Sequence, residues 1–358
     1  MVLSKQANKE MSMHLAHRGP VLEDNLDIII NILLYLPIKS IGRFMIVCKS
    51  WNEVIHKRFF IEMQLSRSLG NPIYIVIKAL VQRPTPTIDR PLSIHSIIAS
   101  WNGLVCKESL FSPSYLPGHR KLSICNPVTD QTFEIPEDSG CSFCQETCLG
   151  VAFGPQCDDY RVYKFVRSPL LIGKHECRMY SSITECWKSL GLAPCFPLSS
   201  QHVFVNGTVY WQIHKGRENF PGAIMSVDSL DNFHTFDIPE IGSGWPHLVS
   251  LGSCLGLVVI YKDVVAASHM SIWVLDMPLP TWTKKLETDI PLPFLDVSVS
   301  AAASGNLIVV TTCMHYLTYH MDKRMWSVSR SVDGINGRTT FSGFFTESLL
   351  SCNGIMEP

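Results

Sequence analysis

The first 65 residues carry apolar positions at the spacing of helices. In residues 27–36 (DIIINILLYL), large aliphatic side chains form one broad stripe made of Ile28, Ile29, Ile32, Leu33 and Leu36. Asp24 and Asn25 precede this stripe as N-cap residues, and Pro37 ends the helix and can open the next one. The pattern predicts two further helices over 40–47 and 50–56. We therefore expect three short helices at the start of the chain.

This helical segment has more large aliphatic side chains than three short helices can enclose. A segment of roughly 40 residues buries too little apolar area to be secure without a neighbour. The surplus needs either the surface of a partner protein or the C-terminal part of the same chain. The spacing alone leaves both alternatives open.

From residue 71 onward the pattern changes to short runs rich in Val, Ile, Tyr, Phe and Trp, separated by Gly, Pro, Asn and Asp. Such runs occupy 73–81, 203–213, 257–261 and 307–312. Runs of this length and composition are typical of strands, and the residues between them are typical of turns. Because helical periods are scarce here, we expect an all-β body.

A repeat of about 50 residues indicates which kind of β protein this is. Glycines precede apolar strands at intervals of 51, 53, 49 and 49 residues, at Gly103, Gly154, Gly207, Gly256 and Gly305. Each repeat also has a strand, a polar turn and then a strand with an aromatic residue, at Phe133, Trp187, Phe233, Trp282 and Trp326. A unit of four strands with this length is typical of a blade of a kelch-type β-propeller.

Five such units are visible, and 73–81 together with 341–351 can supply another by joining the two ends of the body. We therefore expect five to seven blades, with six as the favoured number. A large β-sandwich with accidental spacing is the alternative.

Composition and charge exclude several functions. The chain has 30 basic and 31 acidic residues, so it lacks the net charge that would hold it to nucleic acid or an anionic membrane. The apolar stretch 249–267 is broken by charges, and 28–38 is shorter than the roughly 20 residues of a spanning helix. Residues 1–20 are polar and lack the apolar run of a secretory signal, so we expect a disordered tail there. The protein is expected in the cytoplasm or nucleus, with its 13 cysteines reduced.

The candidate chemistry is sparse. Cys141, Cys144 and Cys148, with Cys157 nearby, form the densest cysteine cluster, but a second CxxC pair or a histidine pair at zinc spacing is missing. We therefore expect a thiol-rich loop instead of a zinc site. The sequence has no nucleophile elbow, phosphate-binding loop or HExxH motif. These features predict a non-catalytic protein without catalytic residues, metal or cofactor.

A specific resemblance appears in residues 36–51 (LPIKSIGRFMIVCKSW). This stretch resembles the core of plant F-box proteins, where Leu-Pro-Val-Lys-Ser is followed by Arg-Phe and then by Val-Cys-Lys-Ser-Trp. The rest is similar to the plant F-box-associated domain, in the stretches SWNGLVC (100–106), DDYRVYKF (158–165), VNGTVYW (205–211) and ESLLS (347–351). The resemblance implies an α+β multidomain protein, with a three-helix F-box in residues 21–65 and a propeller-like domain of about six blades in residues 71–358.

The resemblance also implies a function. Proteins of this family are substrate-recognition subunits of Skp-cullin-F-box ubiquitin ligases. The F-box binds a Skp-type adaptor, the adaptor joins a cullin that carries a RING subunit, and the C-terminal domain holds the protein to be ubiquitinated. On this basis the expected adaptor-binding residues are Leu36, Pro37, Ile38, Ile41, Val47, Cys48 and Trp51. Internal packing of the helices is the alternative role for these side chains, above all for Trp51 and its neighbour Phe44.

Two departures from the family pattern affect the expected docking. Asp24 and Asn25 stand where the family opens its first helix with Leu-Pro, and Gly42 replaces a usual leucine. A glycine inside a helix costs about 1 kcal/mol relative to alanine. We therefore expect weaker adaptor binding than is typical.

Candidate substrate-binding loops lie in the C-terminal domain. Loops over 83–91, 110–120 and 213–221 offer aromatic and cationic side chains suited to a protein interface, namely Tyr115, His119, Arg120, His214, Arg217 and Phe220. The alternative function is a propeller that binds a glycan or small ligand, with weak or lost ligase assembly.

Overall fold

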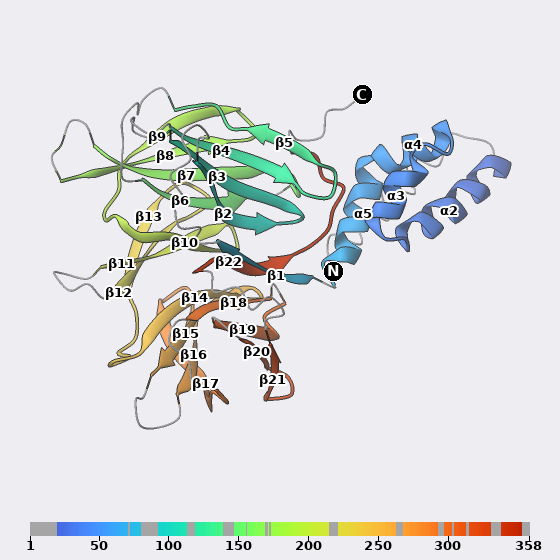
Figure 1. Cartoon of the computed structure of the whole chain (residues 1–358). Helices are drawn as coiled ribbons and strands as arrows, with labels where there is room; N and C mark the ends of the chain where they lie inside the picture. The colour runs from blue at the N-terminus through green and yellow to red at the C-terminus, as the bar shows by residue number, and fades with distance from the viewer. Residues whose placement is uncertain are drawn as a thin grey trace.

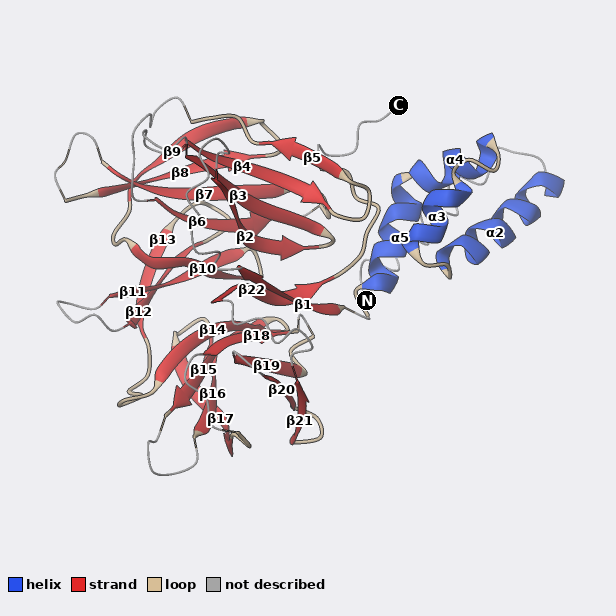
Figure 2. Ribbon diagram, in the orientation of Figure 1, coloured by secondary structure: helices blue, strands red, loops and turns tan. Residues whose placement is uncertain are grey.

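The computed structural model describes residues 20–70, 72–79, 92–112, 119–138, 147–154, 156–168, 171, 173–214, 221–262, 268–292, 297–302, 304–312, 315–330 and 338–352. A group of helices lies beside a ring of small β-sheets (Figures 1 and 2). The described helices are α2 (Pro20–Leu34), α3 (Ile38–Phe44), α4 (Lys49–His56) and α5 (Arg58–Ser68). We call these four helices the helical domain.

The helical domain differs from the prediction in two ways. It has four helices in the described part of the chain where three were predicted, because α5 was not recognised. In addition, α2 begins at Pro20, so Asp24 and Asn25 lie inside the helix and do not cap it. A proline suits the first turn of a helix, where its missing N–H has no intrahelical partner to lose.

Five antiparallel sheets of four strands form the ring in the described residues, and in each the strand order follows the chain. The first two blades are β2 (Leu92–Trp101), β3 (Leu104–Ser112), β4 (His119–Asn126) and β5 (Gln131–Glu134), then β6 (Thr147–Phe153), β7 (Tyr160–Arg167), β8 (His175–Ser181) and β9 (Cys186–Leu192). The third blade is β10 (Pro197–Val205), β11 (Thr208–His214), β12 (Pro221–Val227) and β13 (Phe233–Asp237). The last two are β14 (Trp245–Leu251), β15 (Cys254–Tyr261), β16 (His269–Asp276) and β17 (Thr281–Asp289), then β18 (Val297–Ala301), β19 (Leu307–Thr312), β20 (His315–His320) and β21 (Met325–Arg330).

A two-stranded sheet closes the ring. β1 (Ile73–Ala79) pairs antiparallel with β22 (Arg338–Phe345), which confirms the predicted joining of the two ends of the body. β22 contacts β18 on one side and β2 on the other, so this sheet lies between the fifth and first blades. Five blades lie within the predicted range of five to seven, but the favoured number of six is wrong, because this unit has two strands and the other five have four.

The repeat that predicted the propeller corresponds to real turns. Gly103, Gly207 and Gly305 lie between the first and second strands of their blades at φ of 84°, 79° and 73°, a region that favours glycine. Gly154 follows β6 at the same turn of the second blade. Gly256 was assigned wrongly: it lies inside β15, and the turn of the fourth blade contains Gly252 at φ 66°.

The repeated aromatic residues all lie on the outermost strands. Phe133, Trp187, Phe233, Trp282 and Trp326 belong to β5, β9, β13, β17 and β21. Apolar side chains between neighbouring blades make the propeller core, for example Trp211 with Phe165 and Met225 in the second and third blades. In the described part of the chain, no helix is long and apolar enough to cross a membrane.

Candidate functional site

The four helices pack around a common apolar core. Each helix contributes fully buried aliphatic or aromatic side chains, which are Ile30, Leu33, Leu34, Ile38, Ile41, Val54, Ile55, Phe60, Ile61 and Leu65. Two of the predicted adaptor-binding residues, Ile38 and Ile41, belong to this core, with exposed fractions of 3% and 0%. In this structure their side chains hold α3 against its neighbours and offer no free surface.

The other predicted residues divide into two groups. Leu36 and Trp51 are partly buried and pack against the same core. The Trp51 ring lies 5.2 Å from the Phe44 ring, centroid to centroid, which is the internal packing considered as the alternative for these two aromatics. Pro37, Val47 and Cys48 are exposed. Of the seven predicted side chains, three are thus exposed, two are partly buried and two are buried.

Other apolar side chains near these residues in the sequence are also exposed. Five large apolar side chains of the helical domain are more than half exposed: Ile28 and Ile32 of α2, Tyr35 directly after α2, and Ile46 and Val47 of the turn between α3 and α4. We call them the exposed apolar set. Ile46 is 88% exposed and Tyr35 is 70% exposed. Ile28, Ile32 and Tyr35 follow one another at intervals of four and three residues. The Tyr35 N–H donates to the Ile32 carbonyl oxygen and so continues the helical turn, which places the three side chains on one side.

Sequence reasoning missed most of this set. Ile28 and Ile32 were placed on the same stripe as Leu33, whereas the buried residues of α2 over 27–34 are Ile30, Leu33 and Leu34. The available signal was that α2 is apolar on more than one side, which indicates that two of its faces need partners.

Several exposed side chains of the helical domain carry a positive charge. The guanidinium carbon of Arg67 lies 3.4 Å from the centre of the Tyr35 ring, a geometry that favours a cation–π interaction. Lys39, Arg43, Lys49 and Lys57 are also exposed, and Glu53 is the exposed acid among them. Among the exposed charged side chains described over 27–70, cations therefore outnumber acids.

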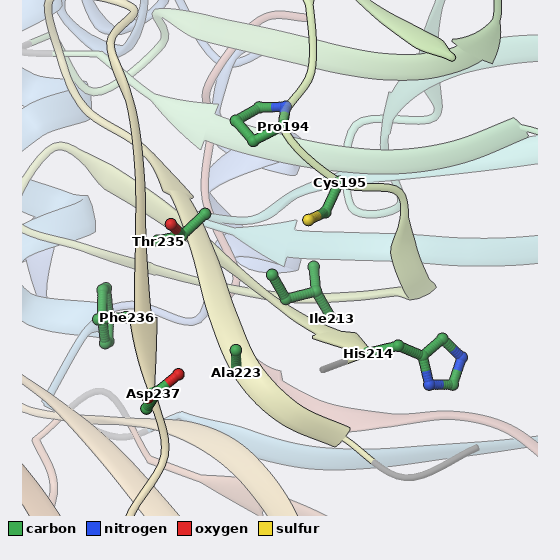
Figure 3. A pocket seen from close by; sticks show the side chains of 8 residues that line it. All are labelled: Pro194, Cys195, Ile213, His214, Ala223, Thr235, Phe236 and Asp237. Carbon is green, nitrogen blue, oxygen red and sulfur yellow. The ribbon is translucent and has the colours of Figure 1, made fainter. Parts of the chain in front are cut away.

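On the propeller, a small pocket lies at the end of the third blade (Figure 3). It has a volume of about 280 Å³ and is lined by Pro194, Cys195, Ile213, His214, Ala223, Thr235, Phe236 and Asp237. The His214 ring points away from the Cys195 sulfur in Figure 3, so these two side chains do not form a nucleophile and base pair. The size of the pocket suits a single side chain or a small polar group.

Most of the predicted interface loops cannot be compared with the structure. Tyr115, Arg217, Phe220 and the loop over 83–91 lie outside the described residues. His119 and Arg120 begin β4, and His214 is exposed at the end of β11, where it lines the pocket.

The cysteine cluster is dispersed as far as it is described. Cys148 is buried in β6 and donates to the carbonyl oxygen of Ser199, with the sulfur 2.8 Å from that oxygen, while Cys157 lies in the turn after β6. Burial raises the pKa of both thiols to about 12, which keeps them protonated. Cys141 and Cys144 lie outside the described residues, and within those residues no three side chains of His, Cys, Asp or Glu gather as metal ligands would.

Comparison with known families and proteins agrees with this architecture. Residues 25–62 match the F-box domain, and residues 74–329 match the F-box associated beta propeller domain. From Arabidopsis thaliana, F-box protein At3g07870 is 25% identical over 295 residues, covering 70% of this chain and 68% of the relative. F-box/kelch-repeat protein At3g23880 is 23% identical and covers 73% of this chain and 78% of its own length. F-box protein At1g30790 is 22% identical and covers 93% and 95%. The chain therefore belongs to the plant-type F-box proteins that carry an F-box associated β-propeller domain.

Proposed function

We propose that this protein is the substrate-recognition subunit of a Skp-cullin-F-box ubiquitin ligase. One observation carries the proposal: the helices already pack against one another and against the propeller, and the helical domain still exposes Ile28, Ile32, Tyr35, Ile46 and Val47. Exposed apolar residues gathered on one small domain mark an interaction site, because water disfavours such a surface. A Skp-type adaptor is the partner that the family implies for an F-box.

The excess of positive charge in the helical domain supports a partner protein with an acidic surface. The side chains described over 27–70 include six Lys and Arg residues and three Asp and Glu residues. Complementary charge speeds association and favours the correct partner. The adaptor surface that meets the F-box is therefore proposed to be acidic around an apolar centre.

The proposed docking residues include only part of the set predicted from the sequence. Val47, Cys48 and Pro37 remain direct contacts, joined by Ile46 and by the exposed side of α2. Ile38 and Ile41 act indirectly, because they set the position of α3 from inside the core. Through the adaptor, the chain would join a cullin and a RING subunit, and the propeller would hold the target protein while performing no bond chemistry itself.

The experiment is a pull-down of a plant Skp-type adaptor by the full-length chain. The test variant is Ile46→Asp/Val47→Asp, which places two carboxylates on the exposed apolar set without touching the core. The matched control is Leu230→Asp/Leu279→Asp on the propeller, where both leucines are more than three-quarters exposed. We expect the test variant to lose at least tenfold in adaptor capture and the control to retain it. Failure of the unsubstituted chain to capture the adaptor would refute the proposal.

A glycan or small ligand of the propeller is a second candidate, and the pocket lined by Thr235, Asp237 and His214 favours it. Ala223 lies in that lining, and a larger side chain there would fill the cavity. Glycan-array binding by the full-length chain, lost in Ala223→Leu, would support this function. Array binding that survives Ala223→Leu would place the ligand elsewhere.

A further inference from the structure

The helical domain and the propeller are joined by a continuous apolar core. The cluster that contains the buried residues of all four helices also contains Leu104, Ile124, Val151 and Tyr160 of the first two blades. α5 lies on the propeller side of the helices (Figure 1). Its buried residues Phe60, Ile61, Gln64 and Leu65 are joined by the partly buried Phe59 and Met63. The helix therefore has protein on more than one side.

The chain segment after β22 belongs to the same core. Residues 346–352, which we call the C-terminal segment, have no regular secondary structure, and yet Ser348, Leu350 and Cys352 are essentially inaccessible. The segment passes between the first blade and the helices in Figure 1. Leu349, Leu350 and Cys352 are members of the shared apolar cluster, so the segment packs where the two domains meet.

Hydrogen bonds join this segment to the first blade. The Asn126 amide nitrogen donates to the carbonyl oxygens of Ser348 and Leu350, at 3.0 and 2.9 Å. The Cys352 thiol donates to the carbonyl oxygen of Gln131, with the sulfur 3.4 Å away. A buried segment outside any sheet needs such donors and acceptors for its peptide groups.

The C-terminal segment packs tightly against the turn of the first blade. A Cβ atom added at Gly103 would lie 2.2 Å from the Ser348 hydroxyl oxygen and 2.7 Å from the Thr346 carbonyl oxygen. At these distances the segment would have to move. Gly103 is therefore required here for space as well as for its φ of 84°.

A charged contact fixes α5 to the second blade. Arg58 Nη2 lies 3.2 Å from Asp158 Oδ1 and also donates to the Gln156 side-chain oxygen, while Arg58 Nε pairs with Glu62 at 2.8 Å. The Asp158 side chain is 6% exposed, so its carboxylate depends on this partner more than a surface acid would. The Glu62 carboxylate also lies within reach of the Cys157 thiol in the same turn.

We propose that the C-terminal segment is a latch that couples closure of the propeller to placement of the F-box, with Arg58 as a positioning residue. Because β22 closes the ring and runs directly into the segment, opening of the β1–β22 pair would also release the surface on which α5 rests. The inference rests on the proposed function, since a fixed F-box would hold the adaptor at a fixed place relative to a target bound on the propeller.

The test compares two glycine turns that share one backbone geometry. Asn102–Gly103 and Asn206–Gly207 have φ values of 51° and 84°, and 48° and 79°. A Cβ at Gly207 would meet the Ser229 Cβ at an ordinary 3.7 Å. Gly103→Ala and Gly207→Ala thus carry the same backbone penalty, and only Gly103→Ala displaces the latch. Amide hydrogen exchange over 58–68 and small-angle X-ray scattering of the full-length chain are the measurements.

We expect Gly103→Ala to speed exchange in α5 at least tenfold and to increase the radius of gyration, while Gly207→Ala matches the unsubstituted chain. Arg58→Ala should act like Gly103→Ala in a milder form, and Arg58→Lys should recover part of the protection. Equal exchange and scattering in the two glycine variants would overturn the inference.

A second variant covers the case in which Gly103→Ala does not fold. Asn126→Asp keeps the oxygen that accepts from the Val128 N–H, at 2.9 Å, but it replaces the two donations to the latch by repulsion between oxygens. It should also release α5, and unchanged α5 exchange in this variant would contradict the inference. Adaptor capture should remain intact in all these variants, because none of the substitutions touches the exposed apolar set. Adaptor capture therefore tests the proposed function, while amide exchange and scattering test the latch.

Discussion

The indole nitrogen of Trp187 lies 2.7 Å from the carbonyl oxygen of Pro136 and donates to it. Trp187 is on the outermost strand of the second blade, and Pro136 follows the outermost strand of the first. Trp282 of the fourth blade makes the same contact with the Asp237 carbonyl oxygen of the third, at 3.0 Å. In the second and fourth blades the tryptophan of the repeat therefore joins the outer edge of its blade to the blade before it.

This hydrogen bond predicts that Trp→Phe lowers stability by different amounts at equivalent positions of the repeat. Trp326 of the fifth blade has a buried indole nitrogen for which the described residues provide no acceptor. Trp→Phe removes the same atoms everywhere, but it breaks a hydrogen bond at Trp187 and Trp282 and removes an unpaired donor at Trp326. Trp187→Phe and Trp282→Phe should each cost about 1 kcal/mol more stability than Trp326→Phe. Urea unfolding of the three variants measures the difference, and equal costs would show that the indole contacts contribute nothing net.

The seam between the second and third blades predicts a dependence of stability on pH. His202 Nε2 accepts from the Val151 N–H at 2.9 Å, and Nδ1 lies 2.9 Å from the Ser200 carbonyl oxygen and donates to it. Part of the imidazole ring remains accessible, but both nitrogens are engaged in this neutral form. Burial lowers the pKa of His202 below the ordinary histidine value, more than the two backbone hydrogen bonds raise it.

In the unfolded chain His202 gains a proton near pH 6.5, while in the folded chain it does so only at lower pH. The unfolded state thus binds more protons, and the contribution of His202 to stability is present above about pH 6.5 and is lost as the pH falls below it. The slope approaches about 1.4 kcal/mol per pH unit. His202→Gln removes this titration, so the variant should lose less stability than the unsubstituted chain between pH 7.5 and 5.5. Parallel losses over that range would exclude His202 as the source.

The fold was predictable where local chemistry repeats. Gly103, Gly207 and Gly305 occupy turns that need positive φ, and aromatic residues recur on the outer strands, so the period of about 50 residues showed the blades directly. Gly256 was misassigned because a glycine inside a strand and a glycine in a turn look alike in sequence. Position 256 needs a glycine for space, because a Cβ there would lie 2.5 Å from Leu251 Cδ1.

The candidate site was less predictable, because it depends on which side of each helix meets protein. α5 was missed since it is apolar on two sides, one toward the other helices and one toward the propeller, and so it lacks a single stripe. α2 is also apolar on two sides, and the pattern could not show that Ile30 faces inward while Ile28 and Ile32 face outward. The apolar surplus of the helical segment is partly buried on the chain's own propeller and partly left exposed. Packing on the chain's own propeller is thus confirmed for the buried part of the surplus, and a partner surface for the exposed part stays a prediction.

Gly42 offers a stabilising substitution within the F-box. It is exposed inside α3, and a Cβ added there would meet nothing within 4 Å. Alanine should therefore gain up to about 1 kcal/mol of helix propensity without a steric cost. Because α3 supports the turn that carries Ile46 and Val47, we expect Gly42→Ala to slow amide exchange in α3 and to leave adaptor capture equal or improved. A measured destabilisation would mean that Gly42 makes a contact which the described residues do not include.

Gly150 predicts the opposite outcome for the same substitution. A Cβ there would lie 2.1 Å from Cζ2 of Trp211, a fully buried ring. Trp211 cannot swing away freely, because its indole nitrogen donates to the Leu149 carbonyl oxygen at 3.1 Å and the Phe165 ring lies 5.0 Å from it edge-on. Overpacking of this kind costs about 1–3 kcal/mol, so Gly150→Ala should destabilise the propeller by that amount.

A double-mutant cycle separates this clash from a general intolerance of β6 to alanine. Trp211→Phe shortens the ring beside Gly150 and is itself destabilising, since it leaves a cavity and removes the hydrogen bond to Leu149. If the clash is the cause, Gly150→Ala should cost less in the Trp211→Phe background than in the unsubstituted chain, with a coupling of at least about 0.5 kcal/mol in denaturant unfolding. Additive costs would instead place the penalty in the backbone of β6, where a side chain at position 150 would be disfavoured whatever ring lies above it.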